Sequence, residues 1–310
     1  MDYFTFITGI VQYFDKIIQL TLNDFFYICQ KSKKMKKITL LLIFISVVAF
    51  AQKKDKLKGS KKVSLELREV GEFETLEVAD DLKVFLVKAD KCSIEIEADD
   101  NLHEALGVTL SGKTLQLSMS KKITGYKKFQ VRINYTNNFK TVISKNDCEV
   151  TALATIELDD ITFKSYNDSK LFLNAKTKSF TLRADDDSKS ELNVKSENTF
   201  LELSKKAYTK ALVSSGNLKV DLYQKTEAEL EGDANEMKLR LDNNANFTGK
   251  KLTAKTMDLS IEGYSNAKVN VSQNLSITST GNSEIELYGD QKIDMKKFTD
   301  NSKLTKKPTR

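Results

Sequence analysis

Hydrophobic and polar residues alternate along most of the chain from about residue 63 onward. The alternation is clear at Val63–Leu67, Leu82–Leu86 and Phe129–Ile133. Because the side chains of a β-strand point alternately to its two faces, a period of two predicts half-buried strands. Only Asn101–Leu106 has the pattern of a helical turn. The pattern therefore predicts an all-β protein.

From about Phe139 the strands repeat at a nearly constant interval. One strand of each unit begins at an apolar residue, in the series Leu182, Leu201, Leu218, Met237, Met257, Leu275 and Ile293. A second short strand lies between these positions, and clusters of Asn, Asp, Ser and Gly separate the strands. Such units, of about 19 residues each, bury their apolar residues only by stacking. The repeat therefore predicts a single-stranded β-helix (solenoid) with roughly seven coils and short parallel strands. A meander sandwich is the alternative, because turns every 8–12 residues suit that fold as well.

An open solenoid exposes strand edges at its ends, so a cap is expected at each. We expect an N-terminal β cap at Val63–Leu117 and a second cap at Phe298–Arg310. The resulting organisation is a lysine-rich linker (52–62), a β-solenoid domain (63–297) and a basic tail (298–310).

Residues 35–51 have the three parts of a secretory signal peptide. Met35-Lys36-Lys37 is the basic region, Ile38–Phe50 is the apolar run, and Ala49-Phe50-Ala51 is the cleavage motif. The apolar run is shorter than the ~20 residues of a spanning helix, so no membrane span is expected in the mature chain. No cysteine follows it, which argues against a lipoprotein. These features predict export through the Sec pathway to the periplasm or the cell surface.

Residues 1–34 precede a complete signal peptide. Signal peptides normally begin a chain, so we interpret Met35 as the start and residues 1–34 as an extension of the gene prediction. The alternative is a translated regulatory or membrane-surface segment.

The charge of the mature chain does not favour nucleic acid. From Gln52 onward there are 43 basic and 40 acidic residues, a net charge of +3. The basic residues are scattered among acids rather than gathered with aromatic residues, so nucleic acid is not an expected partner.

Two cysteines, Cys92 and Cys148, lie in the mature chain. Small exported domains held by disulfides are much richer in cysteine, so we expect two buried thiols. A bridge between them remains the alternative.

Candidate catalytic and metal-binding residues are few. Calcium or glycosidase chemistry would use the paired acids, namely Asp80-Asp81, Asp99-Asp100, Asp159-Asp160 and Asp185-Asp186-Asp187. Because each group flanks a strand and no calcium-binding repeat is present, we interpret them as solvated turn residues. The single histidine, His103, has no G-x-S-x-G motif beside it and is expected at the surface. We therefore assign no catalytic, cofactor-binding or metal-binding residue, and expect no cofactor.

Exposed aromatic residues in a row would indicate a sugar-binding edge. There is no tryptophan, and tyrosines are dispersed at Tyr126, Tyr135, Tyr166, Tyr208, Tyr223, Tyr264 and Tyr288. Four of them, from Tyr208 onward, lie near turns. We expect packing in the core or at turns rather than a binding edge.

The N-terminal half carries a family resemblance. The segments Arg68–Val78, Leu82–Leu86, Ile94–Leu102, Val108–Leu117 and Val131–Tyr135 resemble the head GIN domain family of auto-transporter adhesins, and the similarity extends over about residues 64–290. Members of this family are exported proteins common in Bacteroidetes. The resemblance implies a β-helical fold and a surface or periplasmic role, and it supplies no catalytic residues. The turns depart from the family's frequent Ser-Gly pairs, since Asn, Asp and Lys stand there instead.

Together these features predict a non-enzymatic binding or adhesion module that presents a rigid solenoid face to a protein or glycan of the cell envelope. The alternatives are a β-helical enzyme that acts on polysaccharides, as a lyase or hydrolase, and a structural partner in an envelope assembly. A groove of carboxylates and lysines would favour the enzyme, and a featureless polar face would favour the binding module.

Overall fold

The computed structural model describes residues 55–308. The expected signal peptide and the extension before it lie outside this range. The elements are β1 (Lys56–Lys58), β2 (Val63–Glu69), β3 (Thr75–Val78), β4 (Lys83–Lys88), β5 (Ser93–Asp99), the 3-10 helix η1 (Asp100–Ala105), β6 (Leu106–Ser111), β7 (Thr114–Met119), β8 (Lys122–Thr124), β9 (Phe129–Tyr135), β10 (Thr141–Ser144), β11 (Glu149–Ala152), β12 (Ile156–Ser165), β13 (Lys170–Ala184), β14 (Lys189–Leu203), β15 (Tyr208–Tyr223), β16 (Glu227–Asp242), β17 (Asn246–Ile261), β18 (Asn266–Ser279), β19 (Glu284–Tyr288), β20 (Lys292–Phe298) and β21 (Lys303–Lys306). Within residues 55–308 no helix is long and apolar enough to cross a membrane.

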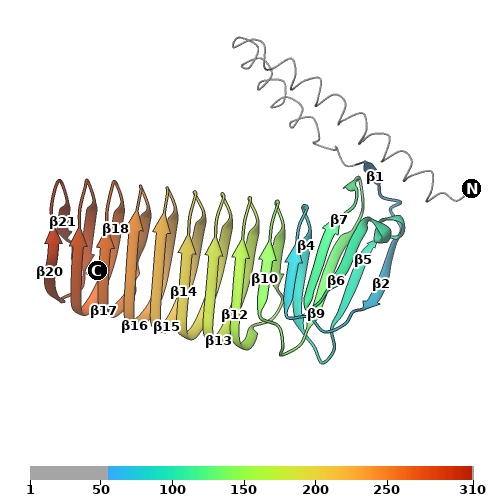
Figure 1. The fold of residues 1–310 in the computed structure, drawn as a ribbon, viewed down its shortest axis with the longest axis horizontal. Helices are drawn as coiled ribbons and strands as arrows, with labels where there is room; N and C mark the ends of the chain where they lie inside the picture. Colours follow the sequence, from blue (N-terminus) through green and yellow to red (C-terminus); the bar gives the residue numbers. More distant parts are fainter. Residues whose placement is uncertain (1–54, 309–310) are drawn as a thin grey trace, which may run out of the picture. The chain divides into compact units, whose positions relative to one another are not determined.

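The strands form a two-sided β-solenoid of about nine turns, which confirms the predicted fold class (Figure 1). Sheet 1 contains β6, β7, β3 and β10, then the second halves of β12 to β18, and ends at β20. Sheet 2 contains β2, β5, β9, β4 and β11, then the first halves of β13 to β18, and ends at β19 and β21. Each of the long strands β13 to β18 bends between its halves, so that one strand serves both sheets.

Tight turns connect sheet 1 back to sheet 2 along one edge of the solenoid. In seven of them two consecutive residues, none of them glycine, have φ between 47° and 71°, as at Asn167 and Asp168. Positive φ at both central positions defines a type I′ turn, and Asn and Asp tolerate this backbone better than most residues. In six of these seven turns the next residue points inward and is small, as in Ser169, Ala207 and Ala245, because little space remains there; Leu82, after Asp80 and Asp81, is the exception.

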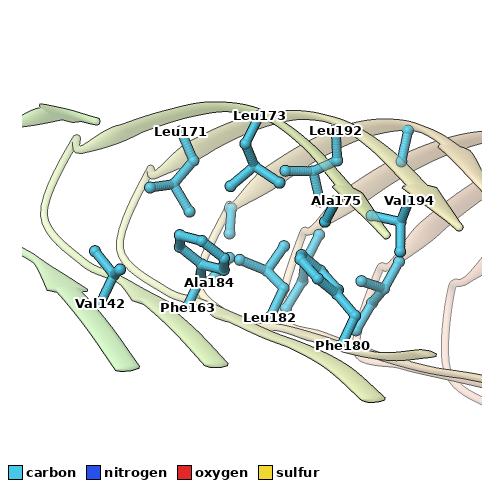
Figure 2. Close-up of a cluster of buried hydrophobic side chains, with 14 of the residues drawn as sticks. Val142, Phe163, Leu171, Leu173, Ala175, Phe180, Leu182, Ala184, Leu192 and Val194 are labelled. Carbon is cyan, nitrogen blue, oxygen red and sulfur yellow. The ribbon is translucent and has the colours of Figure 1, made fainter. Parts of the chain in front are cut away.

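The core lies between the two sheets. Leu171 and Leu173 of sheet 2 point toward Phe163 and Leu182 of sheet 1 (Figure 2). These positions are at most 6% exposed, and in the next coil Leu192 stands beside Leu173 and Val194 beside Ala175, all buried. Apolar burial of this kind supplies about 25 cal/mol per Å². Since no unit closes a core alone, this energy is gained only by stacking coils.

The alignment of the repeat corrects one register. Leu201 pairs with Val220 rather than with Leu218, whose neighbour is Thr199. Leu201 and Leu218 therefore belong to two different columns, that is, to two different stacks of inward-facing residues in successive coils. This shift explains their short separation in the predicted series, and the coil itself has the ordinary length. A slip of two positions preserves the in-and-out alternation, so the hydrophobic pattern alone does not reveal it.

The N-terminal end is closed by antiparallel strands, as expected from the sequence. β2 pairs with β5, β5 with β9, and β6 with β7, all antiparallel. Leu102, at 0% exposure, fixes η1 onto the core. Part of the expected linker is also structured, because β1 pairs with β8 and Gly59 donates a backbone hydrogen bond to Thr124.

The C-terminal end differs from the expected cap. Residues 298–306 do not cover the solenoid but complete its last coil, in which β20 pairs with β18 and β21 with β19. Ile293 and Met295 stand in inward columns and are nevertheless 41% and 45% exposed. The solenoid thus extends past residue 297 and ends open within the described residues.

Candidate functional site

The paired acids have two different environments. Most lie in type I′ turns or are exposed at a bend, which agrees with their interpretation as solvated turn residues: Asp80, Asp81, Asp159, Asp160, Asp186 and Asp187. Asp99 differs, because its side chain is fully buried. Within residues 55–308 no group of three or more His, Cys, Asp or Glu is placed to hold a metal ion.

The buried Asp99 carboxylate connects two loops of the cap by accepting hydrogen bonds from their backbone N–H groups. Its carboxylate accepts backbone hydrogen bonds from Lys61 (2.8 Å), Lys127 (3.0 Å) and Lys128 (3.0 Å). Burial acts to raise the pKa of Asp99, but these backbone donors and the nearby Lys61 charge outweigh it, so the pKa lies below its usual value. The sequence prediction of a solvated residue was wrong because these donors lie 28 to 38 positions away along the chain.

His103 is also buried, at 7% exposure, and not at the surface as the sequence predicted. Its Nε2 lies 2.8 Å from Ser64 Oγ, and its Nδ1 lies 3.1 Å from Glu66 Oε2. Arg68 donates to the other oxygen of Glu66 (2.7 Å) and to the His103 carbonyl (2.9 Å). The cluster therefore joins the edge strand β2 to η1.

The order serine, histidine, carboxylate is that of a hydrolase triad, so its geometry matters. A triad carboxylate accepts a hydrogen bond from Nδ1–H and thereby orients the imidazole. Here Glu66 is near Nδ1 but does not meet the geometry of a hydrogen bond. Its pKa is lowered chiefly by the hydrogen bond from Arg68. The contacts thus describe a cross-link of the cap more closely than an activated serine.

The two cysteines are buried thiols, as predicted, and they are not bonded to one another. Cys148 is fully buried at the inner side of a turn, and this burial raises its pKa to about 11. A thiol held protonated in this way is a poor nucleophile.

The tyrosines form no continuous edge among the described residues. Tyr135 is in the core, and Tyr208 and Tyr223 are half-buried at turns, as expected. Tyr264 and Tyr126 are 66% and 44% exposed, so they are not packed in the way that the sequence predicted.

A hollow of about 650 Å³ follows the bend edge of the solenoid and brings carboxylates and lysines together. It is lined by Asn137, Glu157, Leu158, Asp159, Lys176, Thr177 and Lys178. Asp159 and Lys178 form an ion pair at 3.1 Å, with both side chains more than half exposed. A carboxylate–lysine groove of this kind is the feature that would favour a polysaccharide-acting enzyme.

The charge state of this groove does not suit such chemistry. A lysine that removes a proton from a sugar acid must become neutral, and enzymes lower its pKa for this purpose. The hydrogen bond from Lys178 to Asp159 instead raises the Lys178 pKa. The ammonium is thus held charged, as in an ordinary surface ion pair.

A second hollow of about 400 Å³ lies on the outer face of the cap. It is lined by Val63, Ser64, Leu65, Phe85, Glu95, Glu97, Gln130 and Arg132. Outward side chains of β2 stand beside it: Val63, Leu65 and Leu67 are 38%, 69% and 61% exposed. We call the outer side of β2, β5, β9 and β4 the cap face.

Charged residues border this apolar strip. The register places Leu67 beside Glu95, which pairs with Arg132 at 2.7 Å, and Leu65 beside Glu97, which pairs with Lys128 at 3.0 Å. Exposed apolar residues with a polar rim are typical of protein interaction sites. The alternation at Val63–Leu67 predicts a half-buried strand. The alternation alone does not show that the apolar side of β2 faces outward.

The fold and these surfaces define a class: a β-solenoid whose N-terminal end is closed by antiparallel strands and whose cap carries an exposed apolar face. Residues 72–290 match the family described as "Putative auto-transporter adhesin, head GIN domain". The chain belongs to this family, which confirms the resemblance seen in the sequence. No curated protein matches it.

Solved structures share the fold at low sequence identity. A "putative adhesin" from Parabacteroides merdae ATCC 43184 is 18% identical with a TM-score of 0.58, covering 83% of this chain and 100% of its own. A "putative adhesin" from Parabacteroides distasonis ATCC 8503 is 14% identical with a TM-score of 0.59, covering 81% and 99%. A "putative lipid binding protein" from the same strain is 11% identical with a TM-score of 0.53, covering 81% and 97%. At these identities the likeness concerns the fold.

Proposed function

We propose that this protein is an exported, non-enzymatic adhesion module of the cell envelope that binds a partner protein through its cap face. Membership of an adhesin family supports the binding role. The observation that carries the proposal is the exposure of Leu65 and Leu67, at 69% and 61%, on a face with a charged rim. The stacked coils behind this face serve as a rigid support.

The chemistry of the cap face favours a protein over a glycan. Sugars stack on exposed aromatic rings, but the side chains most exposed here are aliphatic. Burying a leucine side chain supplies roughly 1.5–3 kcal/mol, so two or three such residues suffice for a binding hot spot. Glu95, Glu97 and Arg132 would then select among partners by charge.

The alternative of a polysaccharide-acting enzyme has one observation in its favour, the groove at Asp159 and Lys178. The raised pKa of Lys178 argues against it. Release of unsaturated sugars from anionic polysaccharides, measured by absorbance and lost in Lys178→Met, would establish the enzyme instead.

Binding is tested with beads coated with the protein and applied to immobilised extracellular-matrix proteins and to a glycan array. The variant Leu65→Asp/Leu67→Asp is expected to lose about tenfold or more in binding to a protein surface. Leu212→Asp is the matched control, because Leu212 is 51% exposed on sheet 2 away from the cap face. Equal loss in both variants, or binding confined to glycans, would contradict the proposal.

Export is tested separately by protease treatment of intact and lysed cells that carry a tag at the C-terminus. Loss of the tag from intact cells is expected for surface display. Protection until lysis would exclude surface display and remove the adhesion role.

A further inference from the structure

The last coil of the solenoid presents an unpaired edge. β20 pairs only with β18, and β21 only with β19, among residues 55–308. Alternate backbone N–H and C=O groups of both strands therefore face away from the molecule without a strand partner, which makes this end a template for another strand.

The core is also open at this end. In the preceding coil Leu275 and Ile277 are at most 1% exposed, whereas their successors Ile293 and Met295 are 41% and 45% exposed. Phe298 and Leu304 are only partly buried against the core. A strand laid on β20 would cover both the backbone edge and these apolar side chains.

The charge of the last coil is opposite to that of the remainder. Residues 291–308 contain six lysines and two aspartates, a net charge of +4. Residues 55–290 contain 34 basic and 38 acidic residues, a net charge of −4. Lys292 and Lys297 form no ion pair with the described residues, whereas Lys296 pairs with Asp294, Lys303 with Glu284, Lys306 with Asp290 and Lys307 with Glu286. Lys296 is also the extra residue of a bulge in β20. Lysines and bulges on an edge strand oppose pairing with a like edge.

We propose that the last coil is a docking edge for a β-strand of an acidic partner, and that its lysines exclude a second copy of this chain. Two such ends brought together would place two lysine-rich edges against each other, each with Lys292 and Lys297 unpaired among the described residues. An acidic strand would gain the same backbone hydrogen bonds and apolar contacts, together with charge attraction. This inference does not depend on the cap face.

The test uses three forms of the full mature chain beside the natural one. In the neutral form five lysines are changed to glutamine, and in the reversed form the same five are changed to glutamate: Lys292, Lys296, Lys297, Lys303 and Lys306. The matched control changes five exposed lysines of sheet 2 to glutamine: Lys170, Lys176, Lys189, Lys195 and Lys210. Circular dichroism and thermal unfolding first establish that each form is folded.

Light scattering and sedimentation then report the assembly state at about 50 µM protein and about 50 mM NaCl, where charge screening is weak. We expect the natural chain, the reversed form and the control to be monomeric, and the neutral form to self-associate. The natural chain mixed with the reversed form is expected to give a 1:1 complex, which weakens by about tenfold or more at about 500 mM NaCl. A monomeric neutral form together with no mixed complex would overturn the proposal, as would equal association of the control.

Discussion

Thr209→Val is expected to stabilise the protein, although it removes a polar group. Thr209 is fully buried on the inner side of β15, between Ser190 and Ala228 in the neighbouring coils. Its hydroxyl has no hydrogen-bond partner among residues 55–308. An unsatisfied buried hydroxyl costs about 1–3 kcal/mol, and valine keeps nearly the same shape without that cost. In a protein of this size each kcal/mol corresponds to about 2–4 °C in Tm.

The assay is thermal unfolding followed by calorimetry, with Ser165→Ala as the control. Ser165 is equally buried, but its hydroxyl lies 2.8 Å from that of Ser169, so removing it should lower the stability by about 1 kcal/mol. The two substitutions should therefore shift Tm in opposite directions. A lower Tm for Thr209→Val would refute the reasoning, because it would mean that the hydroxyl is satisfied in the native protein.

Three further predictions concern backbone, thiol and charge. Gly232 has φ of +115°, and a Cβ there would lie 2.1 Å from a carbonyl oxygen of the neighbouring coil, so Gly232→Ala should cost about 1–3 kcal/mol or more, measured as a lower Tm. Cys148, whose pKa is raised by burial to about 11, should not react with a thiol reagent at pH 8 until the protein is unfolded; prompt reaction would contradict its burial. Hydrogen bonds from two lysines lower the Glu74 pKa to about 2 from an ordinary 4.5, so this carboxylate stabilises the fold above pH 4.5 and the effect disappears as the pH falls through 2. The Tm difference between the natural chain and Glu74→Gln should accordingly vanish at about pH 2. A Tm difference that does not change with pH would show that the ionised Glu74 carboxylate is not its cause.

Much of the fold was predictable because it is local and repeated. Strand alternation and a period of about 19 residues are properties of adjacent residues, and both were confirmed. The register between Leu201 and Val220 was not predictable, since a slip of two positions leaves the alternation intact. The open C-terminal end was missed for a related reason: Ile293 and Met295 continue the pattern, and only the absence of a following coil in the described residues exposes them.

Less of the cap could be predicted from the sequence. Asp99 and His103 are buried by residues 28 to 39 positions away, and no spacing rule connects such pairs. The apolar strip at Val63–Leu67 was visible as a strand, but its exposure depends on β2 being the outermost strand of its sheet. A strand's alternation shows that its two sides differ, and tertiary structure decides which side meets solvent.

Because the coils stack in constant register, the number of coils determines the length of the solenoid. Neighbouring strands are separated by about 4.8 Å, and twelve such steps in sheet 2 lead from β2 of the cap face to β21 of the last coil, so the two lie roughly 58 Å apart. Adding or removing one coil would change this distance by one fixed step and leave both ends intact. The solenoid therefore serves as a ruler, and its number of coils fixes how far apart two partners bound at its ends are held.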